Sequence, residues 1–341
     1  MKDSLKIAIA GATGYIGLEL IKILSKHPKV KIIYLCAVKS VGKNINSFDK
    51  KIKKRNLPKI SKIEKINWLN VDVLFTALPN GEAQKIAKYI PSNVKLIDLS
   101  ADFRLKSFEL YKKWYGLNHK CKNLISKSIY AITEFSKDNL SKHNIISCPG
   151  CYPTSVLLAL IPLIKKKMIK TSNIIIDSKS GYSGAGKKIK NKFKYKNLFN
   201  SVSSYGVGFH RHMGEIDQEL SKIANNKVKV SFTPHLIPMF RGIISTMYID
   251  TQTKYTSKKI YQFLKKYHRK NYFVKIAKFN TAIGTGDVMN TNFCRISVCE
   301  NRGKNRVIII STIDNLIKGG SGQAIQNMNV AYKFKETMGL K

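Results

Sequence analysis

The first half of the chain alternates short apolar runs with amphipathic stretches. The apolar runs have the length of strands, and the stretches at 18–26 and 81–90 have the spacing of helices. Strands that alternate with helices are typical of a parallel sheet covered on both faces. The predicted strands are residues 5–10, 31–38, 71–79, 94–99 and 144–147.

The second half follows a different order, because several apolar runs succeed one another without a helix between them. Such grouping indicates an α+β domain built on a largely antiparallel sheet. Helices are predicted at 214–224 and 257–270, and the tail at 319–334 also reads as helical. The predicted strands are residues 173–177, 228–234, 243–250, 273–279, 292–299 and 306–313.

A cysteine stands where the strand at 144–147 meets the next apolar stretch, within the segment Cys148–Thr154. If that stretch is a helix, Cys151 faces unpaired backbone N–H groups and the positive end of the helix dipole, and both favour the thiolate. Pro153 suits the first helical turn, where its missing N–H has no partner. We therefore predict that Cys151 is a nucleophile.

The pair Cys148 and Cys151 also has the spacing of a redox pair or of half a zinc site. A zinc site requires a second pair, and Cys294 and Cys299 are poorly spaced within a predicted strand. Thioredoxin-like proteins carry their pair near the first strand–helix junction, whereas this pair lies in mid-chain. A single reactive thiol without a metal is the favoured interpretation.

Three glycines, Gly11, Gly14 and Gly17, separate the first predicted strand from the first predicted helix. Glycines at this junction allow a pyrophosphate to approach the backbone and to lie on the helix N-terminus. A dinucleotide-binding, Rossmann-type domain is therefore predicted. An NAD site expects an acid after the second strand, but Ala37–Lys43 contains none and offers Ser40 and Lys43 for a 2′-phosphate, which favours NADP.

The segment Gly181–Lys188 resembles a phosphate-binding P-loop, but Lys188 stands where a Mg²⁺-binding hydroxyl is required. The residues after it, 189–196, do not form a convincing apolar helix. We expect instead a loop beside the active site. Its backbone N–H groups and Lys187 could hold a phosphate or a carboxylate.

Two histidines, His210 and His212, lie in a glycine-bracketed loop just before a predicted helix. A pair in such a loop is a better candidate for acid–base chemistry than a lone histidine. A helix N-terminus also keeps an imidazole neutral, which suits a base. The sequence does not choose between the two histidines.

The chain of 341 residues carries a formal net charge of +41, which first suggests a nucleic-acid-binding protein. Lysine is spread over the whole length together with asparagine and isoleucine, as a strongly AT-biased genome produces, and no nucleic-acid-binding motif accompanies it. We expect attraction of anionic metabolites and non-specific polyanions, but no specific nucleic-acid partner. No apolar run is long enough for a bilayer and no signal peptide is recognisable, so a cytoplasmic protein with reduced cysteines is expected.

These pieces together resemble the N-acetyl-γ-glutamyl-phosphate reductase family, nearly from end to end. The order and spacing of the segments make the resemblance specific. The segments that carry it are Gly11–Gly17, Leu78–Gly81, Leu99–Arg104, Pro149–Thr154, Ser180–Gly186, His210–His212 with Glu215–Ile216, Thr233–Pro238, Asp314–Gly319 and Gly322–Ala324.

The resemblance implies an NADP-binding Rossmann domain at 1–150 that is completed by the C-terminal helix, 315–341. It implies a catalytic and oligomerisation α+β domain at 151–314, in a homodimer or homotetramer, with Cys151 as the nucleophile. Arg104, Lys187 and Glu134 are the candidates for binding the substrate. The cofactor-binding residues expected are Gly11, Thr13, Gly14, Tyr15, Ile16, Gly17, Ser40, Lys43, Pro79, Ser183, Gly184 and Asn315.

Three positions depart from the family pattern. Asn80 stands where the family usually has histidine, so any role of that histidine is lost. Cys148 takes the place of an asparagine, which makes its spacing to Cys151 look accidental. The segment Tyr130–Glu134 keeps the glutamate but changes the turn before it.

The expected reaction is the NADPH-dependent conversion of N-acetyl-L-glutamyl 5-phosphate to the 5-semialdehyde through a thioester on Cys151, with His210 or His212 handling the proton. A step of arginine biosynthesis is implied. Related semialdehyde dehydrogenases of the aspartate or acetyl-aminoadipate type remain alternatives, as does a non-catalytic protein that binds NADP or polyanions.

Overall fold

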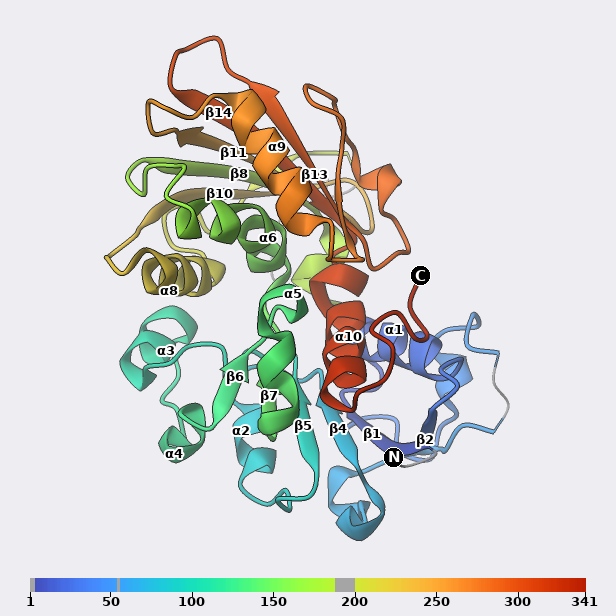
Figure 1. Ribbon diagram of the computed structural model, residues 1–341. Coiled ribbons are helices and arrows are strands. Elements are labelled where there is room, and N and C mark those ends of the chain that lie inside the picture. The colour runs from blue at the N-terminus through green and yellow to red at the C-terminus, as the bar shows by residue number, and fades with distance from the viewer. Residues whose placement is uncertain (1–3, 54–55, 188–199) are drawn as a thin grey trace. The chain divides into compact units, whose positions relative to one another are not determined.

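The computed structural model describes residues 4–53, 56–187 and 200–341, so Lys188 and the run 189–196 lie outside the described residues. The chain divides into two compact units. The first unit comprises Met1–Pro149 and Gly320–Lys341, and the second unit comprises Gly150–Gly319. Figure 1 labels most of their helices and strands.

The first unit is built on a seven-stranded sheet with the order β3-β2-β1-β4-β5-β7-β6, in which every strand pair is parallel. This confirms the predicted Rossmann-type sheet. Two short strands, β3 and β6, lack a clear apolar pattern and were not predicted. The strands are β1 (Leu5–Ala10), β2 (Val30–Cys36), β3 (Ile60–Ser61), β4 (Val73–Thr76), β5 (Lys95–Asp98), β6 (Ser128–Tyr130) and β7 (Ile145–Ser147).

Both faces of this sheet are covered. Ile7 and Ile9 of β1 belong to one apolar cluster, and Ala8 and Ala10 of the same strand belong to another. Helix α10 (Gly322–Ala331) contributes to the first cluster and packs against α1 (Tyr15–Leu24), as Figure 1 shows. The remaining helices of the unit are α2 (Glu82–Ala87), α3 (Phe108–Tyr115), α4 (Lys122–Ile125) and α5 (Thr133–Ser136).

The second unit has a mixed sheet with the order β12-β13-β14-β11-β8-β10-β9. Most of its strand pairs are antiparallel, as predicted, but β10 pairs with β8 and β12 with β13 in parallel. The strands are β8 (Ile174–Gly181), β9 (Ser203–Ser204), β10 (Val230–Ile237), β11 (Ile243–Asp250), β12 (Val274–Ile276), β13 (Cys294–Glu300) and β14 (Arg306–Ile313).

Helices α6 (Cys151–Lys165), α8 (His212–Ala224) and α9 (Ser257–His268) pack against this sheet and against one another (Figure 1). Side chains alternate along β10 and β11 between buried and partly exposed positions, which is the pattern of a sheet covered on one face.

Helix α6 tolerates a proline in its interior. Pro162 cannot donate the N–H that the carbonyl of Leu158 would otherwise accept. The Nε2 atom of His268, on α9, lies 3.0 Å from that carbonyl oxygen, and its Nδ1 atom lies 3.1 Å from the amide of Asn271. The nitrogen that faces the carbonyl therefore carries the proton, and the acceptor freed by the proline is satisfied.

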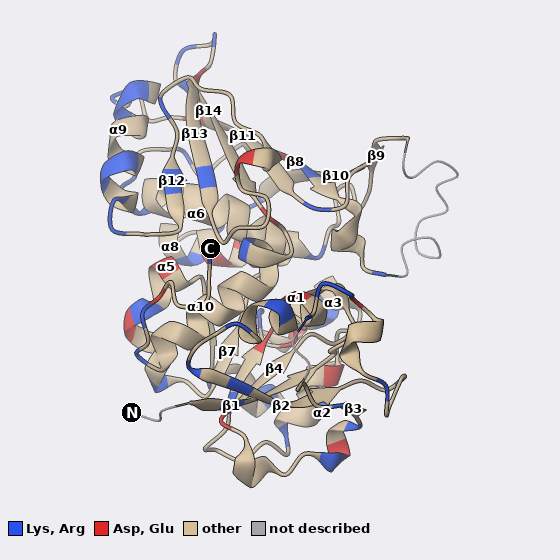
Figure 2. Ribbon diagram, turned by 90° about the vertical axis from the view of Figure 1, so that its right-hand side faces the viewer, with Lys and Arg blue, Asp and Glu red and all other residues tan. Residues whose placement is uncertain are grey.

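Basic side chains lie on helices and loops of both units, as Figure 2 shows, rather than on one element. Among the described residues, no helix combines the length and the apolar composition needed to cross a membrane.

Candidate active site

Cys151 is the first residue of α6, where the sequence predicted it. Gly150 is the N-cap with an extended backbone, and the first helical hydrogen bond runs from the N–H of Thr154 to the carbonyl of Gly150 at 3.0 Å. Cys151 is half-buried, and the first turn contains no acidic residue. Pro153, the third helical residue, removes a donor that the helix would not have used.

Two glycines make room around the cysteine. A methyl group added at Gly319 would lie 2.7 Å from the Cβ atom of Cys151. A methyl group added at Gly150 would lie 2.5 Å from Nε2 of His212. The imidazole of His212 thus occupies the space beside the N-cap that any other residue would fill with its side chain.

The structure separates the two candidate histidines. His212 is buried at the start of α8, and its ring faces Gly150. His210 sits among the rings of Tyr152, Tyr205 and Phe232, with centroid distances of 5.6, 5.4 and 5.5 Å. Burial, helped by the charge of Arg211, lowers the pKa of His210 to about 3. Its Nδ1 atom accepts the backbone N–H of His212 at 3.2 Å.

Glu215 was not predicted as a functional residue, although it lies in one of the segments that carry the family resemblance. It is fully buried, and its Oε2 atom accepts the N–H of Gly150 at 2.8 Å. Its Oε1 atom lies 3.9 Å from Nε2 of His212. Only the packing of α8 on α6 reveals this contact, because the partners are 65 positions apart.

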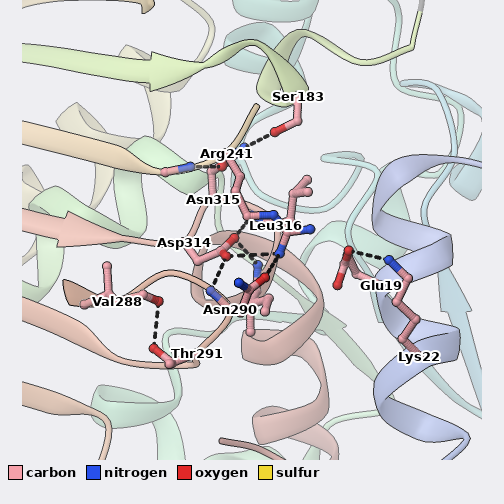
Figure 3. A network of polar contacts seen from close by, with 12 residues as sticks. Glu19, Lys22, Ser183, Arg241, Val288, Asn290, Thr291, Asp314, Asn315 and Leu316 are labelled. Atoms are coloured by element: carbon pink, nitrogen blue, oxygen red, sulfur yellow. Dashed lines mark hydrogen bonds and ion pairs between the residues drawn. The ribbon is translucent and has the colours of Figure 1, made fainter. Parts of the chain in front are cut away.

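A second polar cluster surrounds Asn315 (Figure 3). The side-chain oxygen of Asn315 accepts the N–H of Gly242 at 2.7 Å, and its amide donates to Oγ of Ser183 at 3.0 Å. Gly184 follows Ser183 in the short helical turn at Tyr182–Ala185, and Lys187 is exposed two residues after that turn. Asn315 thereby fixes the loop that contains the predicted cofactor and substrate residues Ser183, Gly184 and Lys187.

Asp314, beside Asn315, is fully buried and accepts a hydrogen bond from Arg241 at 3.1 Å (Figure 3). It also accepts the N–H groups of Asn290 and Leu316 at 2.8 and 2.9 Å. No pattern in the sequence predicts this ion pair. The ion pair fixes the start of the segment from Asp314 to Gly319, and Gly319 packs against Cys151.

The glycine loop of the first unit lies at the switch point of the parallel sheet, between β1 and β4. Gly11 has a φ of +86°, and a methyl group there would lie 2.2 Å from the carbonyl oxygen of Ala77. A methyl group at Gly17 would lie 2.2 Å from the carbonyl oxygen of Gly11. The two glycines therefore allow a tight turn and a close approach of α1, as a dinucleotide site requires.

The remaining cofactor candidates lie on or beside this loop. Thr13, Tyr15 and Ile16 are partly exposed along it, and Pro79 follows Ala77 on the neighbouring loop. After β2 the backbone turns at Ser40, which has a φ of +76°. Lys43 is exposed, and its backbone N–H donates to the carbonyl of Ser40 at 3.2 Å.

Asp102 links two of the segments that carry the family resemblance, Leu99–Arg104 and Leu78–Gly81. Its carboxylate accepts the N–H groups of Gly81 and Gln84 at 2.6 and 3.1 Å and the hydroxyl of Tyr111 at 2.7 Å. The segment at 99–104 thus fixes the turn at 78–81 and the start of α2. Burial and the neighbouring Asp102 raise the pKa of Asp98 to about 6.

Two substrate candidates have structural partners. Arg104 is buried and donates to the carbonyls of Cys148 and Leu99 at 2.7 and 3.2 Å. Glu134 accepts a hydrogen bond from Gln326 on α10 at 2.9 Å. Both hold parts of the first unit together, and their contact with a substrate stays a prediction.

Cys148 differs from Cys151 in its burial and in its place in the fold. It is fully buried, and burial raises the pKa of its thiol to about 12. All six cysteines are free thiols. Within residues 4–53, 56–187 and 200–341, no group of three or more His, Cys, Asp or Glu side chains is arranged to hold a metal ion.

Comparison with known proteins covers both units. Residues 6–143 match the family described as semialdehyde dehydrogenase, NAD binding domain, and residues 151–315 match semialdehyde dehydrogenase, dimerisation domain. A probable chloroplastic N-acetyl-gamma-glutamyl-phosphate reductase of Arabidopsis thaliana is 41% identical over 99% of this chain and 84% of that protein. The N-acetyl-gamma-glutamyl-phosphate reductase of Ehrlichia canis (strain Jake) is 41% identical over 100% of this chain and 98% of that protein.

Solved structures support the fold. Aspartate semialdehyde dehydrogenase II of Vibrio cholerae, complexed with ASA, has a TM-score of 0.72 at 17% identity and covers 97% of this chain and 98% of that one. The aspartate semialdehyde dehydrogenase of Candida albicans with NADP has a TM-score of 0.69 at 16% identity, over 96% and 98% of the two chains. With full-length relatives at 41% identity and both family matches, this chain belongs to the N-acetyl-γ-glutamyl-phosphate reductases of the semialdehyde dehydrogenase family.

Proposed function

We propose that the protein reduces N-acetyl-L-glutamyl 5-phosphate to N-acetyl-L-glutamate 5-semialdehyde with NADPH, as a step of arginine biosynthesis. The observation that carries the proposal is Cys151, a half-buried thiol at the N-terminus of α6 with His212 packed beside its N-cap. The names of full-length relatives from a plant and from bacteria support the substrate.

The glycine loop is suited to the cofactor, because Gly11 and Gly17 leave space that a Cβ atom would fill. Gly14, Thr13, Tyr15 and Ile16 would border the pyrophosphate. Ser40 and Lys43 would hold the 2′-phosphate, since no acid is present between β2 and Lys43. Bound NADPH supplies the hydride for the reduction.

The protein's own groups carry the rest of the chemistry. The Cys151 thiolate attacks the acyl carbon, the C–O bond to phosphate breaks, and inorganic phosphate leaves with the bonding electrons, which gives a thioester. After reduction at the same carbon, the C–S bond of the thiohemiacetal breaks, and the aldehyde leaves while Cys151 regains its electron pair. The N–H groups of Cys151 and Tyr152 would face the developing oxyanion, because Pro153 offers none.

We assign the proton to His212 rather than to His210. His212 lies against Gly150, next to the nucleophile in the chain, whereas His210 is enclosed by aromatic rings. The pKa of His210, lowered to about 3 by burial, keeps that imidazole neutral at physiological pH. His210 would therefore hold His212 in place, and His212 would move the proton.

The nucleophile is tested by Cys151→Ser, assayed in the reverse direction as phosphate-dependent reduction of NADP⁺ with N-acetylglutamate semialdehyde. We expect kcat to fall more than about 10³-fold. A rate near that of the unaltered protein would reject the scheme. The same assay with free glutamate and aspartate semialdehydes tests the substrate, and a preference for the aspartate compound would favour the related dehydrogenase that the fold also resembles.

We infer that the protein forms a homodimer or a homotetramer through the second unit. The match to a dimerisation domain spans this unit. The sheet face opposite the three helices presents the exposed side chain of Tyr248 and the half-buried side chains of Ile244, Thr246 and Ile310, from the paired strands β11 and β14. Light scattering of Ile310→Arg tests the surface: we expect the molar mass to fall to that of one chain, and an unchanged mass would place the interface elsewhere. A cytoplasmic location stays a prediction.

A further inference from the structure

We propose that α9 and the start of β12 form a surface that binds single-stranded nucleic acid, independently of its base sequence. The chain from 251 to 286 contains nine lysines and arginines and no acidic residue. This binding goes beyond the proposed reduction and does not depend on it. We call the surface the basic face, and its exposed cations are Lys258, Lys259, Lys265, Lys266, Arg269, Lys270, Lys275 and Lys278.

Three of these cations form one row along α9. Lys258, Lys265 and Arg269 are seven and four residues apart, so they project from the same side of the helix, with Tyr261 between the first two. The row is about 17 Å long. Figure 2 shows basic residues along α9 and no acidic residue on it. A second row beside the first is formed by Lys259, Lys266 and Lys270.

The stability of α9 does not explain these cations. Lys258 and Lys259 lie in the first turn, where a positive charge opposes the helix dipole. Lys265 and Arg269 are four residues apart, and like charges at that spacing destabilise a helix. Within the described residues, no cation of the basic face forms an ion pair with a carboxylate. A polyanion would supply the missing negative charge.

The lysine-rich composition of the whole chain does not explain the basic face either. The surface helices α1, α2, α3 and α8 each carry an acidic residue together with their lysines. On α1, Lys22 pairs with Glu19 at 2.9 Å, and on α2, Lys85 pairs with Glu82 at 2.7 Å. Helix α9 has the lysines without the acids, so the field that it presents to solvent is uniformly positive.

Aromatic rings lie among the cations of the basic face. Nζ of Lys265 lies 5.8 Å from the ring centroid of Tyr261, and Nζ of Lys275 lies 5.1 Å from that of Tyr272. Tyr272 follows the end of α9 and is 53% exposed, so its ring is accessible to a ligand. Unpaired bases stack on such rings while cations contact the phosphates. Because the bases of a duplex are already stacked and paired, the rings favour a single strand.

Other occupants fit this surface less well. A helix that binds an anionic membrane inserts its apolar side into the lipid. The apolar side of α9, with Ile260 and Leu264, is fully buried, and His268 on the same helix contacts the carbonyl of Leu158 on α6. The surface inferred for the homo-oligomer is the sheet face opposite the three helices, so it leaves α9 uncovered.

The basic face is tested by fluorescence anisotropy with a fluorescein-labelled oligouridylate. The row variant combines Lys258→Gln, Lys265→Gln and Arg269→Gln, which remove three charges from exposed positions. The matched control removes the same charge from exposed lysines of the same unit, by Lys222→Gln, Lys227→Gln and Lys229→Gln.

We expect the dissociation constant at about 50 mM salt to rise at least about tenfold in the row variant and less than about twofold in the control. The plot of log affinity against log salt concentration should become shallower by about 2 in the row variant, because each phosphate contact on a single strand contributes about 0.7. Both variants should keep the kcat and the melting temperature of the unaltered protein. Absence of binding by the unaltered protein, or an equal loss in the two variants, would overturn the proposal.

A second pair of variants tests the stacking. Tyr272→Ala should weaken binding about tenfold with an unchanged salt dependence, whereas Tyr272→Phe, which keeps the ring, should bind as the unaltered protein does. Unlabelled single-stranded RNA and DNA should both compete with the labelled strand. A duplex of equal length and vesicles that contain phosphatidylserine should compete at least about tenfold less well at equal charge concentration. A duplex or a vesicle that competes as well as a single strand would overturn the assignment of the ligand.

Discussion

The glycine loop of the first unit and the surroundings of Cys151 in the second unit both depend on glycines that leave room for a close approach. In the first unit one approach is local, because Gly17 packs against Gly11 six residues earlier, although Gly11 itself packs against Ala77 of the neighbouring loop. In the second unit the partners are distant: Gly150 packs against His212, and Gly319 packs against Cys151. The glycine spacing of a nucleotide loop can therefore be recognised from a short string of letters, whereas the distant approaches around Cys151 cannot.

The largest effect is expected where the distant approach is disturbed. A methyl group in Gly150→Ala would lie 2.5 Å from Nε2 of His212, so the imidazole must move. Overpacking of this kind costs about 1–3 kcal/mol of unfolding free energy. Loss of the positioned proton carrier should lower kcat by about 10²- to 10³-fold.

The matched control is Gly286→Ala, because a methyl group at Gly286 meets no atom within 4 Å. It should leave kcat and the melting temperature close to those of the unaltered protein. NADPH affinity, measured by fluorescence titration, should stay within about twofold in both variants. A Gly150→Ala protein with normal kcat would mean that His212 does not need its place beside the N-cap.

Disturbing the approach of Gly17 to Gly11 should weaken NADPH binding and leave the reactivity of Cys151 unchanged. Gly17→Ala would place a methyl group 2.2 Å from the carbonyl oxygen of Gly11, whereas Gly14→Ala would meet that oxygen only at 3.4 Å. We expect the dissociation constant for NADPH to rise more than about tenfold in the first variant and by less in the second. Alkylation of Cys151 should be unaffected in both variants. Equal affinity losses would show that the spacing between loop and helix is not what the glycines provide.

The difference between local and distant contacts also explains which strands and site residues could be predicted from the sequence. The longer strands of both sheets follow apolar runs, so their existence could be predicted, whereas β3, β6 and β9 are too short to show a pattern. Cys151 could be predicted because a strand and a helix meet at it. Glu215 could not, because its partner at Gly150 is set by the packing of α8 on α6. The same holds for Arg241 and Asp314, whose ion pair joins two loops of the second unit.

A smaller effect concerns stability at acid pH. Folded His210 stays neutral until its pKa of about 3, whereas the unfolded chain takes up the proton near the ordinary value of 6.5. Between these values the unfolded state binds more protons, so this residue makes the protein less stable as the pH falls from 6.5 towards 3. The slope is at most about 1.4 kcal/mol per pH unit for one group.

His210→Asn keeps an acceptor for the N–H of His212 but does not titrate. Urea unfolding at a series of pH values from 5 to 7 should give a shallower pH dependence for this variant than for the unaltered protein. Buried His27 and His119, whose pKa values are also lowered by burial, contribute to both curves and cancel in the comparison. Identical slopes would show that burial does not lower the pKa of His210 in the folded protein.

The smallest effect on activity is expected when Cys148 is replaced. This residue shares a short motif with Cys151 but has different neighbours in the structure. The string from Cys148 to Cys151 looks like one local motif, yet the two thiols meet different surroundings. Cys148 is fully buried, its thiol has a pKa raised to about 12, and its sulfur lies 3.6 Å from the amide of Asn327 on α10. Cys151 is half-buried at a helix N-terminus.

In Cys148→Ala we expect kcat to stay within about twofold and the unfolding free energy to fall by about 1 kcal/mol, because a small buried group is lost. Strong loss of activity with a normal melting temperature would mean that the pair acts together, and that the local motif, rather than the packing around Cys151, carries the chemistry.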